Sequence, residues 1–366
     1  MLPIMSAVFG VIILNIDVNS DIWQYLAGAD KPIVLYGMGN GADKIIDRLG
    51  SLGIGVAGVF ASDEFVRHQQ FRGFTVCSYA DAKRTFGDMI VLVAFGTFRS
   101  DVIENIRRIG AEQELYAPDV PAYGSEYFTL SYYRENELRF ERLYDRLADE
   151  QSKNVLRHTV LYKLTGKIEH LFACESTYDE ANRNVLLLGN DELYLDIGAY
   201  NGDTVLQFAD AVDSYRGVIA VEPDRKTYRK LALNIDGMRD VQIINAAVGD
   251  RVGEIRFSSR GGRNSSVGEG ETVTSVTVDS ICDGRDVTYI KIDVEGEEAA
   301  VISGATKTIA DKHPKMLVSA YHRSGDIVDL FEQITNIHAD YDVYMRHYRY
   351  IPCWDTNLYF VPRCVK

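Results

Sequence analysis

A strand, a glycine-rich turn and a helix follow one another between residues 193 and 212, and this succession constrains the fold more than any other feature of the chain. Leu193–Asp196 has the apolar character of a buried strand. Gly198 and Gly202 let the backbone turn sharply and come close to a ligand. Apolar residues from Val205 to Val212 then recur with the i, i+3, i+4, i+7 spacing of a helix face. The pattern predicts the first unit of a nucleotide-binding α/β sheet.

The turn carries an acidic residue where a dinucleotide site would have a glycine. From Asp196 to Gly202 the spacing is Asp-x-Gly-x-x-x-Gly rather than Gly-x-Gly-x-x-Gly. An acidic group here would repel a pyrophosphate, but it would attract the ammonium and sulfonium groups of a cofactor such as S-adenosylmethionine. The next strand, Gly217–Val221, is followed by Glu222, whose carboxylate can accept hydrogen bonds from both hydroxyls of a ribose. Either motif alone is more often ordinary turn chemistry, whereas the two together favour a nucleoside site.

The chain then continues as an open sheet. Further strands are predicted at Val241–Ile244, Val287–Ile292 and Lys315–Ala320, with an antiparallel pair at Asp342–Arg346 and Leu358–Val361. Because the carboxyl ends of neighbouring parallel strands meet at one crevice, the side chains that follow them should converge there. Those side chains are Asp196, Glu222, Asp293 and His322.

A second strand, turn and helix precede this region. Lys31–Tyr36 is followed by Gly37–Ala42, which has the Gly-x-Gly-x-x-Ala spacing of dinucleotide sites. Later apolar runs predict a half-size Rossmann domain over residues 1–120, in which Asp63 is a candidate ribose ligand. The glycines either bind a nucleotide or nucleotide sugar, or merely allow tight strand-to-helix packing, since no catalytic His, Lys or Tyr-x-x-x-Lys pair accompanies them.

Residues 121–190 have the character of a helical connector between this domain and a second domain at 191–366. Helices are predicted at Tyr132–Glu150 and at about Ser152–Leu164. They either pack between the two domains or form a homo-oligomer interface or a lid over the site.

Charge and cysteine usage restrict the partners and the compartment. A formal net charge of −14 argues against nucleic acid as a partner, because negative potential repels it. Five scattered cysteines, never in Cys-x-x-Cys spacing, fit reduced thiols in the cytoplasm. The apolar run Met1–Leu14 is shorter than a membrane span and lacks signal-peptide features, so it is interpreted as a packed N-terminal segment.

The C-terminal half resembles the FkbM-type family of S-adenosylmethionine-dependent methyltransferases. The most specific match is Tyr289–Glu298, which reads Tyr-Ile-Lys-Ile-Asp-Val-Glu-Gly-Glu-Glu. Asp-Ile-Gly-Ala-Tyr-Asn-Gly at Asp196–Gly202, Val-Glu-Pro at Val221–Pro223 and Ala-Val-Gly at Ala247–Gly249 support it. The resemblance implies a class I methyltransferase fold, a seven-stranded Rossmann-like sheet with its last strand antiparallel, preceded by the smaller Rossmann-like domain and the connector helices.

The same resemblance implies which residues hold the cofactor, with Glu222 at the ribose and Asp293 near the transferring methyl group. The implied cofactor-binding residues are Asp196, Gly198, Ala199, Tyr200, Asn201, Gly202, Glu222, Pro223, Asn245, Ala246 and Asp293. Two positions depart from the commoner family pattern. Tyr200 stands where an Asn is usual, and Ala320 replaces the Glu of a Glu-x-His pair that ends in His322.

The resemblance also implies the reaction, O-methylation of a hydroxyl on a sugar, glycan or secondary metabolite. Such a transfer must align the hydroxyl with the methyl group and remove a proton. His322 is expected to be the base, because an unperturbed His titrates near 6.5, with Asp293 orienting it. A metal held by Asp293, Glu295 and the histidines His322 and His347 stays open, as does a nucleotide-sugar or NAD-dependent oxidoreductase, or a non-catalytic binding protein, using the N-terminal loop.

Overall fold

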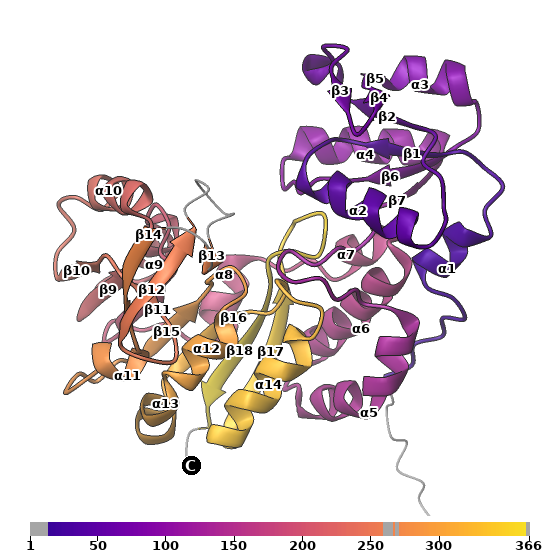
Figure 1. Ribbon diagram of the computed structural model, residues 1–366. Coiled ribbons are helices and arrows are strands. Elements are labelled where there is room, and N and C mark those ends of the chain that lie inside the picture. The colour runs from indigo at the N-terminus through magenta and orange to yellow at the C-terminus, as the bar shows by residue number, and fades with distance from the viewer. Residues whose placement is uncertain (1–13, 259–265, 268–270, 364–366) are drawn as a thin grey trace, which may run out of the picture.

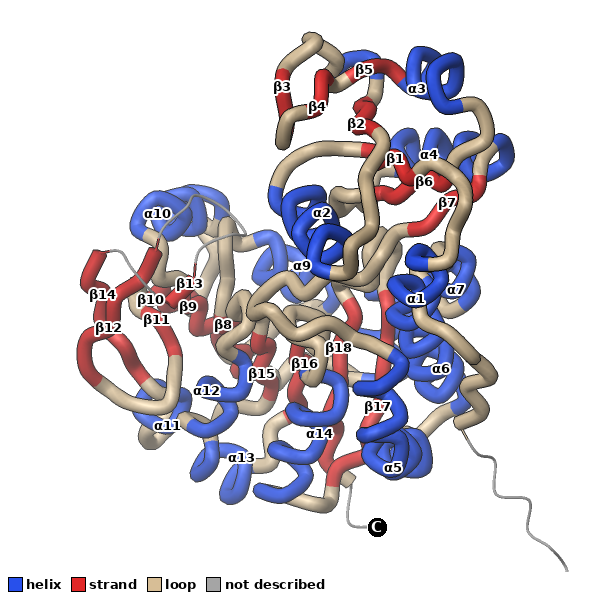
Figure 2. Tube along the Cα trace, turned by 45° about the vertical axis from the view of Figure 1, so that its right-hand side comes forward, coloured by secondary structure: helices blue, strands red, loops and turns tan. Residues whose placement is uncertain are grey.

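The computed structural model describes residues 14–258, 266–267 and 271–363, which form two α/β units joined by helices (Figure 1). The predicted packing of the first fourteen residues falls almost entirely outside this range, although Leu14 itself is buried. In both views the smaller N-terminal sheet lies above helices α6 (Glu150–Thr165) and α7 (Glu169–Ala173) (Figure 1, Figure 2).

The N-terminal sheet has five parallel strands in the order β5-β2-β1-β6-β7. Its strands are β1 (Ile33–Tyr36), β2 (Gly58–Ala61), β5 (Cys77–Ser78), β6 (Ile90–Val93) and β7 (Glu114–Tyr116). The three central strands are apolar runs buried at every position, as strands covered on both faces must be. Helices α1 (Ile22–Ala27) and α2 (Asn40–Ser51) pack on one face, and α3 (Tyr79–Phe86) and α4 (Ser100–Glu112) on the other.

The C-terminal sheet has seven strands in the order β10-β9-β8-β15-β16-β18-β17, and β18 runs antiparallel to both neighbours. This confirms the predicted fold class. The strands are β8 (Leu193–Ile197), β9 (Gly217–Val221), β10 (Val241–Ile244), β15 (Tyr289–Ile292), β16 (Lys315–Ser319), β17 (Tyr341–His347) and β18 (Thr356–Pro362).

Helices cover both faces of this larger sheet. On one face lie α9 (Asp203–Ala211) and α10 (Arg225–Asn234), which pack on the apolar side chains of β8 and β9. The other face is covered by α11 (Val278–Ile281), α12 (Glu298–Ser303), α13 (Thr306–Lys312) and α14 (Asp326–Ile337) and, over β17, by α6. Parallel strands therefore end at one edge between two helical layers, which is where such sheets bind ligands.

The remaining strands form two small sheets. One joins β11 (Ala247–Val248), β12 (Gly253–Ser258), β13 (Ser266–Val267) and β14 (Glu271–Val276), and the other is the hairpin β3 (Gln70–Phe71) with β4 (Phe74–Thr75). Most of the Gly/Ser-rich segment at residues 259–270 lies outside the described residues. A short 3-10 helix, η1, spans Asp63–Phe65.

The connector contains the two predicted long helices, but the first ends earlier than Glu150, the predicted end. Helix α5 runs over Leu130–Arg146 and stops because Leu147 has an extended backbone. Asp149 then caps α6, since its side chain accepts a hydrogen bond from Ser152 N. Three short elements follow: α7, α8 (Tyr178–Glu180) and the π-helix η2 (Ala181–Val185).

Helix α6 contributes apolar side chains to the cores of both units. Val155, Leu156 and Val160 pack with the larger sheet, whereas Tyr162 packs with the N-terminal strands. The Tyr162 hydroxyl also donates to Ala117 O after β7, at 2.7 Å. The helix thus fixes the two sheets against each other.

A loop between β17 and β18 makes the second connection between the units. Ile351 and Cys353 are fully buried in the same apolar cluster as Val34 of the N-terminal sheet. Ile351 and Thr97 exchange two backbone hydrogen bonds, at 2.7 and 2.9 Å. Within the described ranges, no helix is long and apolar enough to cross a lipid bilayer.

Candidate active site

A cavity of about 1130 Å³ opens at the carboxyl edge of the larger sheet and extends to the N-terminal unit. From the sheet, it is lined by residues that follow β8, β9, β15 and β16. From the N-terminal unit it is lined by Met38, Asn40 and Lys44, and by the segment that follows β7. The two nucleotide-type folds therefore face one shared cavity.

The structure brings most, but not all, of the predicted residues to the cavity wall. Those that line it are Gly198, Tyr200, Glu222, Pro223, Ala246, Asp293 and His322. The others do not line it: Asp196, Ala199, Asn201, Gly202 and Asn245. Their predicted contacts with a cofactor remain predictions.

Asp196 is completely buried and already has protein partners. Lys291 Nζ lies 3.2 Å from Asp196 Oδ1, and the Thr204 hydroxyl donates to Asp196 Oδ2. Lys291 also donates to Gly198 O, at 3.3 Å. A buried carboxylate requires such pairing, so Lys291 competes with any cofactor ammonium group for Asp196.

The turn after β8 depends on backbone conformations that suit glycine. Gly198 has φ +79°, and a Cβ there would lie 1.9 Å from Asp293 O, so the turn packs directly on the end of β15. Tyr200 has φ +46°, an uncommon conformation for a residue with a side chain. Its amide donates to Glu222 Oε2, at 3.1 Å. Backbone strain of this kind is concentrated at functional sites.

Glu222 is held at the end of β9 with its carboxylate in the cavity wall. It is 7% exposed and accepts backbone hydrogen bonds from Tyr200 N and, at 2.8 Å, from Asp224 N. Burial nevertheless raises the pKa of Glu222 to about 7. Asn245, which follows the neighbouring strand β10, donates hydrogen bonds from its side-chain amide to Glu222 O and Pro223 O, at 2.8 and 3.0 Å.

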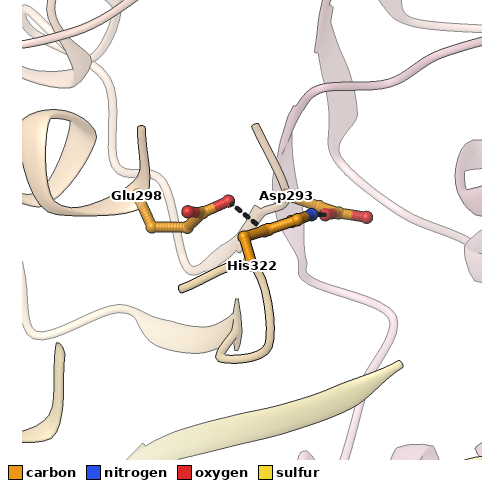
Figure 3. Close-up of side chains that lie close together, drawn as sticks. All are labelled: Asp293, Glu298 and His322. Atoms are coloured by element: carbon orange, nitrogen blue, oxygen red, sulfur yellow. Dashed lines mark ion pairs between the residues drawn. The ribbon is translucent and has the colours of Figure 1, made fainter. Parts of the chain in front are cut away.

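His322 lies among carboxylates, as Figure 3 shows for Asp293 and Glu298 on either side of its ring. Its Nδ1 is 2.9 Å from Glu298 Oε1, and its Nε2 is 3.5 Å from Glu295 Oε2 and 3.7 Å from Asp293 Oδ1. Burial alone would lower the pKa of His322, but these carboxylates outweigh it and raise the pKa well above its usual value. The ordinary titration near 6.5 that the sequence analysis assumed does not apply to this ring.

His347, the other histidine considered, belongs to a different environment. It is buried, its Nδ1 lies 2.9 Å from Thr356 Oγ1, and burial lowers its pKa to about 3. Asp293, Glu298 and His322 each place a ligand atom within 4.8 Å of the others, a spacing that could hold a metal ion. Sequence reasoning missed Glu298, although the signal was present, because this residue ends the Tyr289–Glu298 motif.

The N-terminal glycine loop shows close packing. A Cβ on Gly41 would lie 2.4 Å from Ala94 O, and one on Gly37 would lie 2.4 Å from the Phe95 ring. These contacts support the interpretation that the glycines allow strand and helix to approach. Asp63, the candidate ribose ligand, is exposed and lies outside the cavity wall.

Aromatic residues that the sequence did not single out form the far wall of the cavity. Phe98 and Tyr350 have ring centroids 5.9 Å apart, and Tyr350 and Trp354 have centroids 5.5 Å apart. Gly96 gives them room, since a Cβ there would lie 2.6 Å from the Trp354 ring. Trp354 Nε1 is buried and has no hydrogen-bond partner within the described residues.

Comparison with known proteins shows what the C-terminal region is similar to. Residues 196–352 match the family model described as the methyltransferase FkbM domain. The crystal structure of methyltransferase FkbM from Methylobacillus flagellatus KT is similar over 90% of each chain, with a TM-score of 0.67 and 20% identity. No curated protein matches the sequence significantly.

Two further solved structures are much less similar. An rRNA methylase from Streptococcus thermophilus has a TM-score of 0.32 and 12% identity over 48% of this chain and 88% of its own. Fibrillarin from Aeropyrum pernix, with bound S-adenosyl-L-methionine, has a TM-score of 0.33 and 11% identity over 50% of this chain and 71% of its own. The family match and the similarity to the FkbM methyltransferase structure confirm the predicted resemblance.

Proposed function

The chain contains an FkbM-type methyltransferase domain, and from that premise we propose that it transfers a methyl group from S-adenosylmethionine to a hydroxyl of a sugar-bearing acceptor. The observation that carries this proposal is the cavity at the carboxyl edge of the larger sheet. It brings the Gly198 turn, Glu222 and Asp293 together in one cavity at the strand ends, where sheets of this kind bind nucleoside cofactors.

The cofactor fits the residues of this wall. Glu222 presents a buried carboxylate with a raised pKa, which the two hydroxyls of a ribose can satisfy by donating hydrogen bonds. Ala246 is small and leaves space for the adenine beside the strand ends. At Gly198 the absence of a side chain allows the methionine portion to approach the turn. When bound, the cofactor supplies an electrophilic methyl group.

The protein's own groups then have to hold the acceptor and take up its proton. Asp293 lies at the end of β15, beside the Gly198 turn, and also faces His322. We assign the positioning of the reacting hydroxyl to Asp293 and His322 and the uptake of its proton to the Asp293 carboxylate, because His322, whose pKa the surrounding carboxylates raise, has no free ring nitrogen to accept a proton at neutral pH.

The size and lining of the cavity favour an uncharged, sugar-bearing acceptor. Pockets of roughly 300–1000 Å³ hold one drug-sized ligand, so a cavity of about 1130 Å³ leaves room beside a cofactor. Seven Asp or Glu side chains line it against three Lys or Arg side chains, and this negative excess repels phosphorylated acceptors. The rings of Phe98, Tyr350 and Trp354 offer apolar faces on which a sugar ring can stack.

Calorimetric titration of the full chain tests the cofactor first. We expect saturable binding of S-adenosylmethionine and S-adenosylhomocysteine, weakened at least about tenfold in Glu222→Ala by loss of the ribose contact. Asp213→Ala, which removes an exposed carboxylate outside the cavity, should bind as the wild type does. Binding of NAD or a nucleotide sugar without either sulfur compound would overturn the proposal.

The acceptor class is tested by transfer of a radiolabelled methyl group. Neutral glycosides and their phosphorylated counterparts would be offered to the enzyme at equal concentration. We expect label in the neutral series, resistant to mild alkali as an ether is. Label only in phosphorylated acceptors, or in base-labile esters, would contradict the proposed substrate.

A further inference from the structure

We propose that His322 Nε2 and the carboxylates of Asp293 and Glu295 bind a divalent metal ion at the cavity wall, with Glu298 positioning the imidazole from the opposite edge. The identity of the cavity rests on the proposed function, but the metal site itself rests only on these four side chains. Divalent manganese or magnesium fits a set of one imidazole nitrogen and two carboxylates, with no thiolate.

Local charge is the first argument. Asp293, Glu295 and Glu298 each place an oxygen within 4.0 Å of a ring nitrogen of His322, as the distances 3.7, 3.5 and 2.9 Å show. One imidazolium carries a single positive charge, so it leaves these carboxylates with a negative excess. Buried charges in proteins are paired or coordinate metals.

The neighbouring cations are already engaged elsewhere. Lys291 Nζ is 3.9 Å from Asp293 Oδ2, but it is closer to Asp196, at 3.2 Å. Arg323 donates to Gly296 O, at 2.8 Å, and its guanidinium faces Glu297. A fourth acid, Asp326, lies near Glu298 and His322. A divalent cation would add positive charge to this acidic group.

The two edges of the imidazole are not equivalent. On the Nδ1 edge, Glu298 is 1% exposed and its Oε1 is fixed by Val294 N, which donates to it at 2.9 Å. On the Nε2 edge, Asp293 and Glu295 have about a third of their side chains exposed, and both line the cavity. Figure 3 shows Asp293 and Glu298 on opposite sides of the ring, so one ion cannot use both nitrogens. The accessible edge is the Nε2 edge.

The separations on the Nε2 edge suit a shared ion better than direct hydrogen bonds. Neither ring nitrogen of His322 makes a hydrogen bond of standard geometry within the described part of the chain. Oxygens at 3.5 and 3.7 Å from Nε2 are too far for strong hydrogen bonds. Ligands bound at about 2.1 Å to one ion lie roughly 3.0–3.5 Å apart in octahedral or tetrahedral geometry. To bind one ion at these lengths, both carboxylates would have to move toward Nε2.

Two further features are typical of a metal site. A carboxylate next to the second ring nitrogen, as Glu298 is, orients metal-binding histidines in many proteins. Glu295 has φ +54°, a strained conformation for a residue with a side chain, and this directs its carboxylate to the cavity. The remaining positions on the ion would face the acceptor, whose hydroxyl oxygen the ion could bind and polarise.

The test is a manganese titration of the full chain, freed of metal with a chelator and followed by electron paramagnetic resonance without cofactor or acceptor. We expect about one Mn²⁺ per chain in the wild type. Glu295→Gln and His322→Gln should each weaken it at least about tenfold, because each removes a ligand. Glu297→Gln is the matched control, since Glu297 also lines the cavity but faces Arg323.

The outcomes separate this proposal from the proposed function. No Mn²⁺ binding by the folded wild type, or equal losses in Glu295→Gln and Glu297→Gln, would overturn the metal site. Circular dichroism checks that each variant is folded, and Glu298→Gln provides a second route to the same site if His322→Gln does not fold. Cofactor binding is measured separately by calorimetry, so Mn²⁺ bound without S-adenosylmethionine affinity would overturn the function alone.

Discussion

The buried ion pair between Lys163 and Asp119 should be among the most sensitive points of the structure. Lys163 lies on α6 and Asp119 follows β7, with 2.9 Å between Nζ and Oδ2. The two side chains are 2% and 4% exposed, and Cys353 donates its thiol to Asp119 Oδ1. Burial would lower the pKa of Lys163, but Asp119 outweighs it and raises the pKa, so the ammonium group stays charged throughout the neutral range.

The proposed change is Lys163→Met, which keeps the length of the side chain and removes the charge. It leaves the Asp119 carboxylate buried without its cation, and breaking a buried pair in this way costs about 3–5 kcal/mol. This lowers the ratio of folded to unfolded protein by roughly two to three and a half orders of magnitude. Lys163→Met combined with Asp119→Leu should recover most of the loss, because an apolar pair of similar volume carries no desolvation cost.

Urea-induced unfolding, followed by the fluorescence of the two tryptophans, measures the change. The midpoint of Lys163→Met should fall by about 1 M or more, given a urea dependence of about 3 kcal/mol per M. Lys153→Met on the same helix is the control, because Lys153 pairs with the 80% exposed Glu150 and such pairs contribute less than about 1 kcal/mol. A loss in Lys163→Met no larger than in this control would refute the reasoning.

Three other changes have clear expected outcomes. Gly198→Ala should destabilise the protein by more than about 2 kcal/mol in urea unfolding, because the new Cβ would lie 1.9 Å from a backbone oxygen after β15, whereas Gly189→Ala, in open space, should cost little. Because burial raises the pKa of Glu222 from 4.5 to about 7, its ionisation destabilises the fold, so stability should fall by about 2–4 kcal/mol between pH 4.5 and pH 8 and fall less in Glu222→Gln. Gly96→Ala should displace the Trp354 ring, shift its fluorescence and raise the KM for acceptor more than the dissociation constant for cofactor.

The sequence was informative wherever local pattern decides structure. Apolar runs followed by glycine turns marked the central strands of both sheets, and the rule for strand ends placed Glu222, Asp293 and His322 at one cavity. By contrast, β5 has only two residues, too few for any periodicity to predict.

Contacts between separate elements account for what the sequence did not reveal. Lys291 reaches Asp196 because β15 pairs in parallel with β8 and places these residues directly opposite, a register that one sequence does not specify. His322 was assigned an ordinary pKa because its three carboxylates follow another strand or begin another helix. The aromatic wall likewise combines Phe98 with Trp354 from the opposite end of the chain.

The loop between β17 and β18 bears on any attempt to isolate the methyltransferase half. A shortened chain that begins at residue 191 would keep this loop and lose the N-terminal strands that enclose it. Ile351 and Cys353, both fully buried in the whole protein, would then face water and favour self-association. Thr97, which pairs with Ile351 through two backbone hydrogen bonds, would be missing as well. The protein is therefore a poor candidate for dissection by truncation, even though its sequence divides readily on paper.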